Sequence, residues 1–142
     1  MNRKINITHY KQKETIQGFL DVNISEMNSI VNYSVDMLYC SVLNKIEKNK
    51  IKHYLDQMIE KIRYGGQLII KIINVHDVCK AYVNRSISNN DFFGMIQNIS
   101  EELSEEEIIT YITSKHGFEI IGFENIDYTT TINLQRALND KN

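Results

Sequence analysis

The chain has 142 residues, of which 42% are hydrophobic and 24% charged, and its formal net charge is −2. This length fits one domain, so we expect a single domain over residues 1–142. The net charge of −2 gives no electrostatic reason to expect nucleic acid as a main partner. No apolar run is long enough to span a bilayer and the first residues are polar, so no membrane span or signal peptide is expected.

The two cysteines, Cys40 and Cys79, form no CxxC or Cys/His ligand pattern. Both lie among apolar residues, which predicts buried free thiols in a reducing compartment. The sequence therefore favours a cytoplasmic location, which would be the host cytoplasm if the source is viral. No metal site is predicted, because His53 and His116 have no further ligands at metal spacing.

The first part of the chain predicts three strands. Residues 4–9, "KINITH", alternate and are rich in β-branched side chains. Residues 18–24, "GFLDVNI", form a second run opened by a glycine, and the connector 25–34 can hold a short helix. Residues 34–42, "SVDMLYCSV", are largely apolar, which is consistent with a strand buried on both faces.

The centre of the chain predicts a long helix followed by the strongest strand. Apolar residues recur at helical spacing over 46–62, after an N-cap at Asn44. We predict that this helix ends at Gly65 and Gly66, where glycine can take the left-handed conformation of a helix cap. The run 67–74, "QLIIKIIN", is nearly continuous in apolar residues and predicts a strand in the middle of a sheet.

Two further helices follow the central strand. Asn74 is a suitable N-cap for a helix over 75–85, "VHDVCKAYVNR". Ser88 is a suitable cap for a weaker helix within 88–99, "SNNDFFGMIQNI". Together these two segments predict a helical connection between the central strand and the last part of the chain.

The last part of the chain gives the clearest helix and then a hairpin. Ser104 and Glu107 form a capping box, and the helix over 104–117 closes with a basic turn and a glycine. The runs 118–124 and 127–137 are two strands joined by a short turn, which predicts an antiparallel pair.

The expected elements are therefore three strands, a long helix, the central strand, the helices that follow it and two final strands. Strands that alternate with helices indicate an α/β fold with a mostly parallel sheet and helices on both faces. The final hairpin adds an antiparallel strand to this sheet.

Five segments carry a resemblance to a known family. Lys4–Ile7, "KINI", and Gly18–Ile24, "GFLDVNI", look like its first two strands, and Val35–Ile46, "VDMLYCSVLNKI", looks like its fourth strand and the helix start after it. Arg63–Leu68, "RYGGQL", looks like its "KPGGKL" turn, and Gly117–Ile120, "GFEI", is similar to the entry into its late strands. The chain thus resembles the class I S-adenosylmethionine-dependent methyltransferases, and in particular compact methyltransferase-like proteins of bacteriophages and bacteria with AT-rich genomes.

The resemblance implies a Rossmann-like methyltransferase fold with S-adenosylmethionine bound at the C-terminal edge of the sheet. The family's glycines after the first strand match Thr8, His9 and Tyr10, and its ribose-binding acidic residue matches Asn23. Ser41 opens the segment that matches the family's "HVLEH". These five residues are the candidate cofactor-binding residues. Their identities differ from the family's, so the resemblance is to a degenerate member that has lost the glycine-rich loop.

A second polar cluster follows the central strand. Asn74, His76 and Asp77 would lie at the edge where open α/β sheets bind ligands, and they are candidate substrate-binding residues. Alternatively, Asn74 caps a helix and Asp77 interacts with its N-terminal dipole. His9 is either a general base or a loop residue that fills the space of a missing glycine. No nucleophile–base pair, Walker loop or GxGxxG is present, so the sequence names no catalytic residue.

Three functions remain open from the sequence. In the first alternative the chain is a divergent methyltransferase that binds S-adenosylmethionine. In the second it is an inactive module of that fold, which binds a protein partner or associates with itself. In the third alternative it binds another small molecule or nucleotide in a crevice lined by His9, Asn23 and Asn74. An exposed edge strand, or an apolar patch near Phe92 and Phe93, would favour assembly. An open pocket at the carboxyl edge would favour a ligand.

Overall fold

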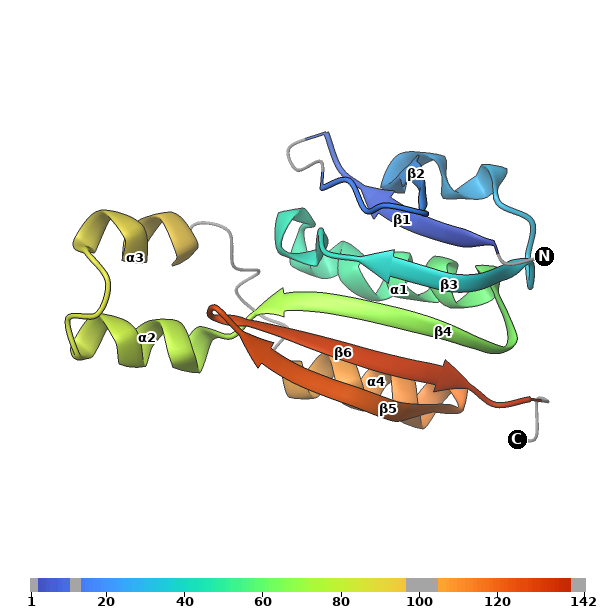
Figure 1. Cartoon of the computed structure of the whole chain (residues 1–142). Coiled ribbons are helices and arrows are strands. Elements are labelled where there is room, and N and C mark those ends of the chain that lie inside the picture. The colour runs from blue at the N-terminus through green and yellow to red at the C-terminus, as the bar shows by residue number, and fades with distance from the viewer. Residues whose placement is uncertain (1–2, 11–13, 97–104, 139–142) are drawn as a thin grey trace.

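The computed structural model describes residues 3–10, 14–96 and 105–138, and its elements follow the predicted order (Figure 1). Six strands lie at β1 Lys4–Thr8, β2 Leu20–Asn23, β3 Val35–Cys40, β4 Ile62–Ile73, β5 Phe118–Ile126 and β6 Thr129–Arg136. The helices are α1 Lys48–Lys61, α2 Val75–Val83, α3 Asn89–Ile96 and α4 Glu105–His116, with short 3₁₀ helices η1 Ile24–Ser29 and η2 Leu43–Lys45.

All six strands form one sheet in the order β2-β1-β3-β4-β6-β5. The strands β1 to β4 are parallel to one another, whereas β6 is antiparallel to both β4 and β5. The predicted fold class is confirmed: an α/β fold with a mostly parallel sheet and an antiparallel C-terminal hairpin. The carboxyl ends of the four parallel strands meet at one edge, and α2 and α3 lie beyond that edge (Figure 1).

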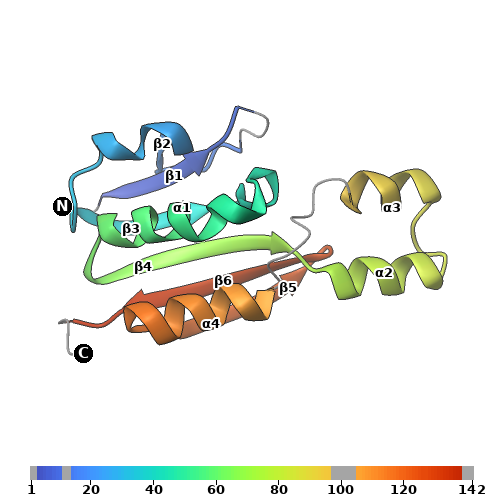
Figure 2. The same cartoon turned by 180° about the vertical axis from the view of Figure 1, so that it is seen from behind.

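The two helices that cover the sheet, α1 and α4, lie on one side of it. They lie behind the sheet in Figure 1 and in front of it in Figure 2. Leu38, Leu68 and Leu134 are fully buried and belong to the same core cluster as Leu55 and Met58 of α1. We call this side the helical face and the opposite side the open face.

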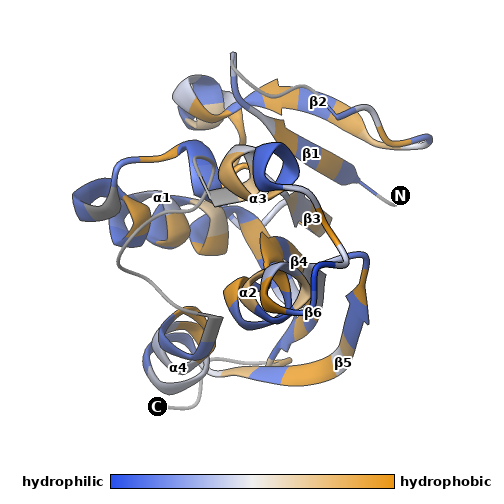
Figure 3. Cartoon of the chain, turned by 90° about the vertical axis from the view of Figure 1, so that its left-hand side faces the viewer, coloured by the Kyte–Doolittle hydropathy of each residue, from blue (hydrophilic) through white to orange (hydrophobic). Residues whose placement is uncertain are grey.

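The open face differs from our expectation of helices on both faces. Among the described residues no helix lies over it, as the end-on view shows (Figure 3). The physical reason is the short connection 9–19 between β1 and β2, whose described residues form no helix. Asn6, on the open face of β1, donates a hydrogen bond from its amide to the backbone oxygen of Glu14. This bond holds the connection against the sheet.

The bounds predicted for the long helix were wrong at both ends. Residues 43–45 form η2, and α1 begins at Lys48 rather than after Asn44. It ends at Lys61, four residues before the glycine pair. Its last carbonyls accept hydrogen bonds from distant groups, since the backbone amides of Tyr33 and Ser34 bond the oxygens of residues 60 and 61. Tertiary partners therefore replace the glycine cap that we expected.

Gly65 and Gly66 lie inside β4, not at a helix end. Gly65 does have a left-handed conformation, with φ +78°, which glycine adopts at little cost. A Cβ on Gly66 would come within 2.8 Å of the Ile62 Cγ2 atom and 3.0 Å of the Val35 carbonyl oxygen. The register of β3 against β4 shifts at the same point, between Val35 and Met37. The pair therefore allows β3 and β4 to approach closely at an irregularity of the sheet.

Two of the predicted helix caps are confirmed. The Asn74 side chain accepts a hydrogen bond from the backbone amide of Asp77 at 3.2 Å, and Ser88 accepts one from Asp91 at 3.1 Å. The capping box at Ser104 lies outside the described residues, as does the part of the predicted second helix after residue 96. Local sequence signals thus located these helix starts correctly.

The prediction of two buried thiols is correct for one cysteine only. Cys40 is fully buried in β3, and burial raises the pKa of its thiol to about 12. Cys79 is exposed on α2, and both cysteines are free. The prediction for Cys79 failed because α2 lies beyond the sheet edge, where an apolar neighbourhood in sequence does not produce burial. None of the helices among the described residues has the length and apolar character needed to cross a bilayer.

Candidate functional site at the carboxyl edge

The ends of three adjacent strands bring together three of the predicted cofactor residues. Thr8 ends β1 and is the register partner of Asn23, which ends β2. Ile7 is the partner of Cys40, so Ser41 follows on the other side of Thr8. Thr8 and Ser41 are buried and Asn23 is half-buried. The edge therefore presents a short row of hydroxyl and amide groups.

The other two predicted cofactor residues, His9 and Tyr10, follow β1 directly. Their rings stack, with centroids 4.5 Å apart and an angle of 28° between the planes. Tyr10 is 73% exposed, whereas His9 is half-buried. An exposed aromatic ring at this position offers a stacking surface for a flat heterocycle such as adenine.

Asn23 already uses its side-chain oxygen within the fold. Its Oδ1 accepts hydrogen bonds from the backbone amide of Ser25 at 3.0 Å and from the Ser25 hydroxyl at 2.8 Å, and thereby caps η1. An amide oxygen has two lone pairs, so both are occupied. The family's carboxylate accepts hydrogen bonds from ribose hydroxyls, but Asn23 could contact a ribose only by donating from its amide nitrogen.

The predicted substrate cluster lies at the start of α2. The Asn74 side-chain oxygen accepts a hydrogen bond from the backbone amide of Asp77. The Asn74 side-chain nitrogen donates a hydrogen bond to the Thr130 hydroxyl at 3.3 Å. Asp77 is half-buried in the first turn of α2, and His76 is exposed. Asn74 therefore caps α2, as the sequence predicted. The cluster lies beyond the row of Thr8, Asn23 and Ser41, because β4 continues to Ile73 past the level of the β3 end.

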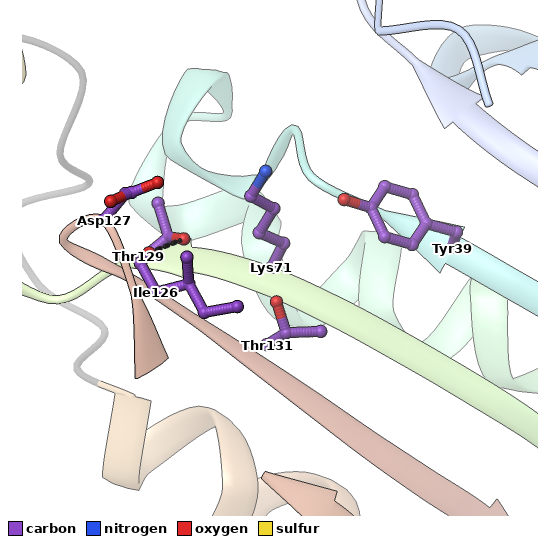
Figure 4. Close-up of a pocket in the computed structure, with 6 residues that line it drawn as sticks. All are labelled: Tyr39, Lys71, Ile126, Asp127, Thr129 and Thr131. Carbon is purple, nitrogen blue, oxygen red and sulfur yellow. Dashed lines mark hydrogen bonds between the residues drawn. The ribbon is translucent and has the colours of Figure 1, made fainter. Parts of the chain in front are cut away.

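Sequence reasoning missed a hollow of about 340 Å³ on the open face, next to the carboxyl edge. It is lined by Tyr39, Lys71, Ile126, Asp127, Thr129 and Thr131. The Tyr39 hydroxyl and the Lys71 ammonium extend into this space from neighbouring strands, and Asp127 lies across from them in the β5–β6 turn (Figure 4). The sequence does contain a signal for this hollow, because Tyr39 and Lys71 interrupt apolar runs. Both residues lie at positions that face away from the helices.

The hollow combines groups of opposite charge. The Lys71 Nζ atom lies 3.8 Å from the Glu14 carboxylate, and Asp127 contributes a second carboxylate to the rim. Burial, and then the negative charge of Glu14, raises the pKa of Tyr39 to about 12, so its hydroxyl remains a neutral donor near pH 7. The hollow can therefore offer an ammonium, a phenol and threonine hydroxyls to a polar ligand. No group of three His, Cys, Asp or Glu side chains in the described part of the chain could hold a metal ion.

Comparison with known proteins finds similar folds among solved structures. No protein-family model and no curated protein matches the sequence. Among solved structures, an O-methyltransferase family protein from Burkholderia thailandensis aligns with a TM-score of 0.57 at 14% identity, over 86% of this chain and 36% of that one. An S-adenosylmethionine-dependent methyltransferase from Methanosarcina mazei aligns with a TM-score of 0.57 at 16% identity, over 85% and 68%. The chain has the class I methyltransferase-like fold.

Another S-adenosylmethionine-dependent methyltransferase, from Archaeoglobus fulgidus, also aligns with a TM-score of 0.57, at 12% identity over 84% of this chain and 68% of that one. The chain spans between 35% and 68% of the length of the eight similar structures.

The residues at the positions that match the family's cofactor site are polar or aromatic, and they do not include the family's glycines. Tyr10 offers a stacking surface, and the row of Thr8, Asn23 and Ser41 offers polar groups. The family's glycines let its backbone approach the methionine portion, but Thr8 and His9 carry side chains at the matching positions. Any cofactor contact here would therefore rely on side chains rather than on a glycine cradle.

Proposed function

We propose that this methyltransferase-like protein binds S-adenosylmethionine, through its adenosyl portion, at the carboxyl edge of the sheet. The observation that carries the proposal is the meeting of Thr8, Asn23 and Ser41 at three adjacent strand ends, next to the exposed Tyr10 ring. Ligands of open α/β sheets bind at this edge. Tyr10 would stack on the adenine, and the Asn23 amide would donate to the ribose.

The hollow beside this row supports a site for a second molecule, the methyl acceptor. S-adenosylmethionine supplies a methyl group on a sulfonium, and transfer depends mainly on an acceptor placed in line with it. Tyr39 and Lys71 would orient an acceptor by hydrogen bonds, and Asn74, His76 and Asp77 would contact the part of it that extends over α2. The open hollow favours a ligand-binding function over a fold kept only for assembly.

The first test is isothermal titration calorimetry of the purified, folded protein with S-adenosylmethionine and with S-adenosylhomocysteine. We expect a dissociation constant below about 100 μM, which corresponds to roughly −5.5 kcal/mol. Tyr10→Ala should weaken binding about tenfold, since stacking contributes about 1–3 kcal/mol per base. Phe123→Ala, which removes an exposed aromatic ring from the other end of the sheet order, is the matched control and should bind like the parent protein.

A second variant tests the ribose contact without disturbing the fold. Asp caps a helix as well as Asn does, so Asn23→Asp should keep the bonds to Ser25. A carboxylate has acceptor sites left over after two bonds, and these could accept the ribose hydroxyls. We expect Asn23→Asp to bind S-adenosylmethionine about 5- to 15-fold more tightly.

The absence of measurable heat with the parent protein and with Asn23→Asp, both folded by circular dichroism, would contradict the proposal. Binding that Tyr10→Ala and Asn23→Asp leave unchanged would show that the ligand lies elsewhere.

A further inference from the structure

The outer strand β5 differs from the opposite outer strand of the sheet in length and in composition. β2 has four residues, and β5 has nine. Nine residues of extended chain at the end of the strand order present a row of backbone groups about 30 Å long, with which no further strand of the described residues pairs. Natural sheets shorten such edges or protect them with lysine or proline. The sequence of β5, "FEIIGFENI", contains neither.

The side chains of β5 are unusually apolar for their exposure. Ile120, Ile121, Phe123 and Ile126 are each 46–53% exposed. The outer edge of the sheet is accordingly coloured hydrophobic along much of β5 in Figure 3. Scattered single apolar residues on a surface need no explanation, but four exposed apolar side chains on one nine-residue edge strand exceed such scatter.

The two faces of β5 have different chemistry. Ile120 and Phe123 are the register partners of the buried Leu134 and Ile132, so they lie on the helical face. Glu119 and Glu124 are paired with Gln135 and Thr131, and so they lie on the open face, where both are exposed. A strand added to this edge would therefore meet apolar side chains on one face and carboxylates on the other.

The charges of β5 disfavour a second copy of the same strand. Both of its charged side chains are glutamates, and the following turn adds Asp127. Like charges opposite each other destabilise a strand pair, whereas opposite charges stabilise it. Charge complementarity favours a partner strand that carries lysine or arginine.

We propose that β5 is a docking edge for an extended segment of another protein, in which basic residues alternate with apolar ones. The segment pairs with the outer backbone of β5 and continues the sheet by one strand. Its basic side chains lie beside Glu119 and Glu124, and its apolar side chains cover Ile120 and Phe123. Backbone hydrogen bonds supply affinity in this mode, and the alternating side chains supply specificity.

The test uses a fluorescein-labelled nine-residue peptide of alternating lysine and valine and measures its binding by fluorescence anisotropy. The control peptide has the same sequence with an N-methyl group on every backbone amide, which keeps the charge and removes the amide donors of both strand edges. We expect saturable binding of the first peptide, with binding of the control at least tenfold weaker. Hydrogen exchange should show protection of backbone amides in β5 when the first peptide is bound.

Charge-reversal variants locate the site. The double variant Glu119→Lys/Glu124→Lys should weaken binding about tenfold or more, because it replaces two attractive contacts by repulsive ones. Glu106→Lys, at an exposed position on α4, changes the net charge by as much as Glu119→Lys alone, so the two single variants are compared, and Glu106→Lys should have a much smaller effect. All variants change exposed residues, and circular dichroism checks their folding.

Three results would overturn the proposal. The N-methylated peptide could bind as tightly as the parent peptide, which would show attraction of charge without strand pairing. The double variant could bind like Glu106→Lys, which would place the contact away from β5. The protein alone could form a dimer by light scattering that Phe123→Lys dissociates, which would make a second copy of the chain the occupant of the edge.

Discussion

At the scale of single residues, Gly66 lies where its neighbours leave no space for a side chain. A Cβ there would lie 2.8 Å from the Ile62 side chain, 2.9 Å from the carbonyl oxygen of Arg63 and 3.0 Å from that of Val35. Two of these neighbours are backbone atoms, one in β4 itself and one in the adjacent strand β3, so they cannot move aside without distorting β4 or shifting β3 against it. The glycine is thus required by packing.

We predict that Gly66→Ala lowers the free energy of unfolding by about 1–3 kcal/mol, the usual cost of overpacking. Urea denaturation followed by circular dichroism measures it. Gly94→Ala is the matched control, because a Cβ on Gly94, inside α3, meets nothing within 4 Å. That change should be neutral or stabilising by up to about 1 kcal/mol. Equal stability of Gly66→Ala and the parent protein would contradict the packing argument.

At the scale of elements, one side chain of β6 closes the end of α1. The Arg136 guanidinium donates to the carbonyl oxygens of Ile59 at 2.8 Å and Ile62 at 2.9 Å. It also lies over the stacked rings of Tyr33 and Tyr64, 5.0 and 4.7 Å from their centroids. These contacts join the first helix to the last strand, and they explain why α1 ends where no local glycine signal is found.

Arg136→Ala should therefore destabilise the protein by about 2–3 kcal/mol, since hydrogen bonds from a charged donor contribute about 1.5–3 kcal/mol. Thermal or urea unfolding of the variant and the parent protein measures this difference in the free energy of unfolding. Arg136→Lys keeps the charge but loses the planar fork and the stacking, and we expect it to recover less than half of the loss. A lysine variant as stable as the parent protein would show that charge alone suffices.

At the scale of the whole molecule, α1 and α4 are joined over the helical face by a polar cluster around Asp56. Its carboxylate accepts hydrogen bonds from the Tyr111 hydroxyl at 2.7 Å and from the His116 Nε2 atom at 2.9 Å. The Lys115 Nζ atom lies 3.8 Å from the Oδ2 atom of Asp56. Partial burial acts to raise the pKa of Asp56, but the bonds from Tyr111 and His116 and the charge of Lys115 outweigh it, so the pKa is lowered.

A carboxyl group with a lowered folded-state pKa stabilises the protein above its unfolded pKa, about 3.9, and loses that contribution as the pH falls through the folded value. We predict that the stability difference between the parent protein and Asp56→Asn is largest above about pH 5 and shrinks below pH 4. Urea denaturation at several pH values measures it. Asp127→Asn, at an exposed carboxylate in the β5–β6 turn, serves as the control. A difference that stays constant from pH 7 to pH 3 would contradict this assignment.

The open face is also a property of the whole molecule. Tyr39 and Lys71 lie within runs that read as strands buried on both sides, and in the sequence they look like interruptions of a core pattern. They line a hollow because none of the helices in the described part of the chain lies over that face (Figure 3). The predicted cofactor row, in contrast, followed from the strand ends alone, because parallel strands place their carboxyl ends at one edge. Whether that row binds S-adenosylmethionine stays a prediction.

The sequence by itself determined the order of elements, the caps at Asn74 and Ser88 and the α/β class, because caps and apolar periodicity are local properties. Tertiary structure decided where α1 ends, which cysteine is buried and which face of the sheet stays open. Each of these depends on contacts between segments far apart in the chain, such as Arg136 with the end of α1. The exposure of β5 has the same origin, since only the strand order places an apolar strand at the edge of the sheet.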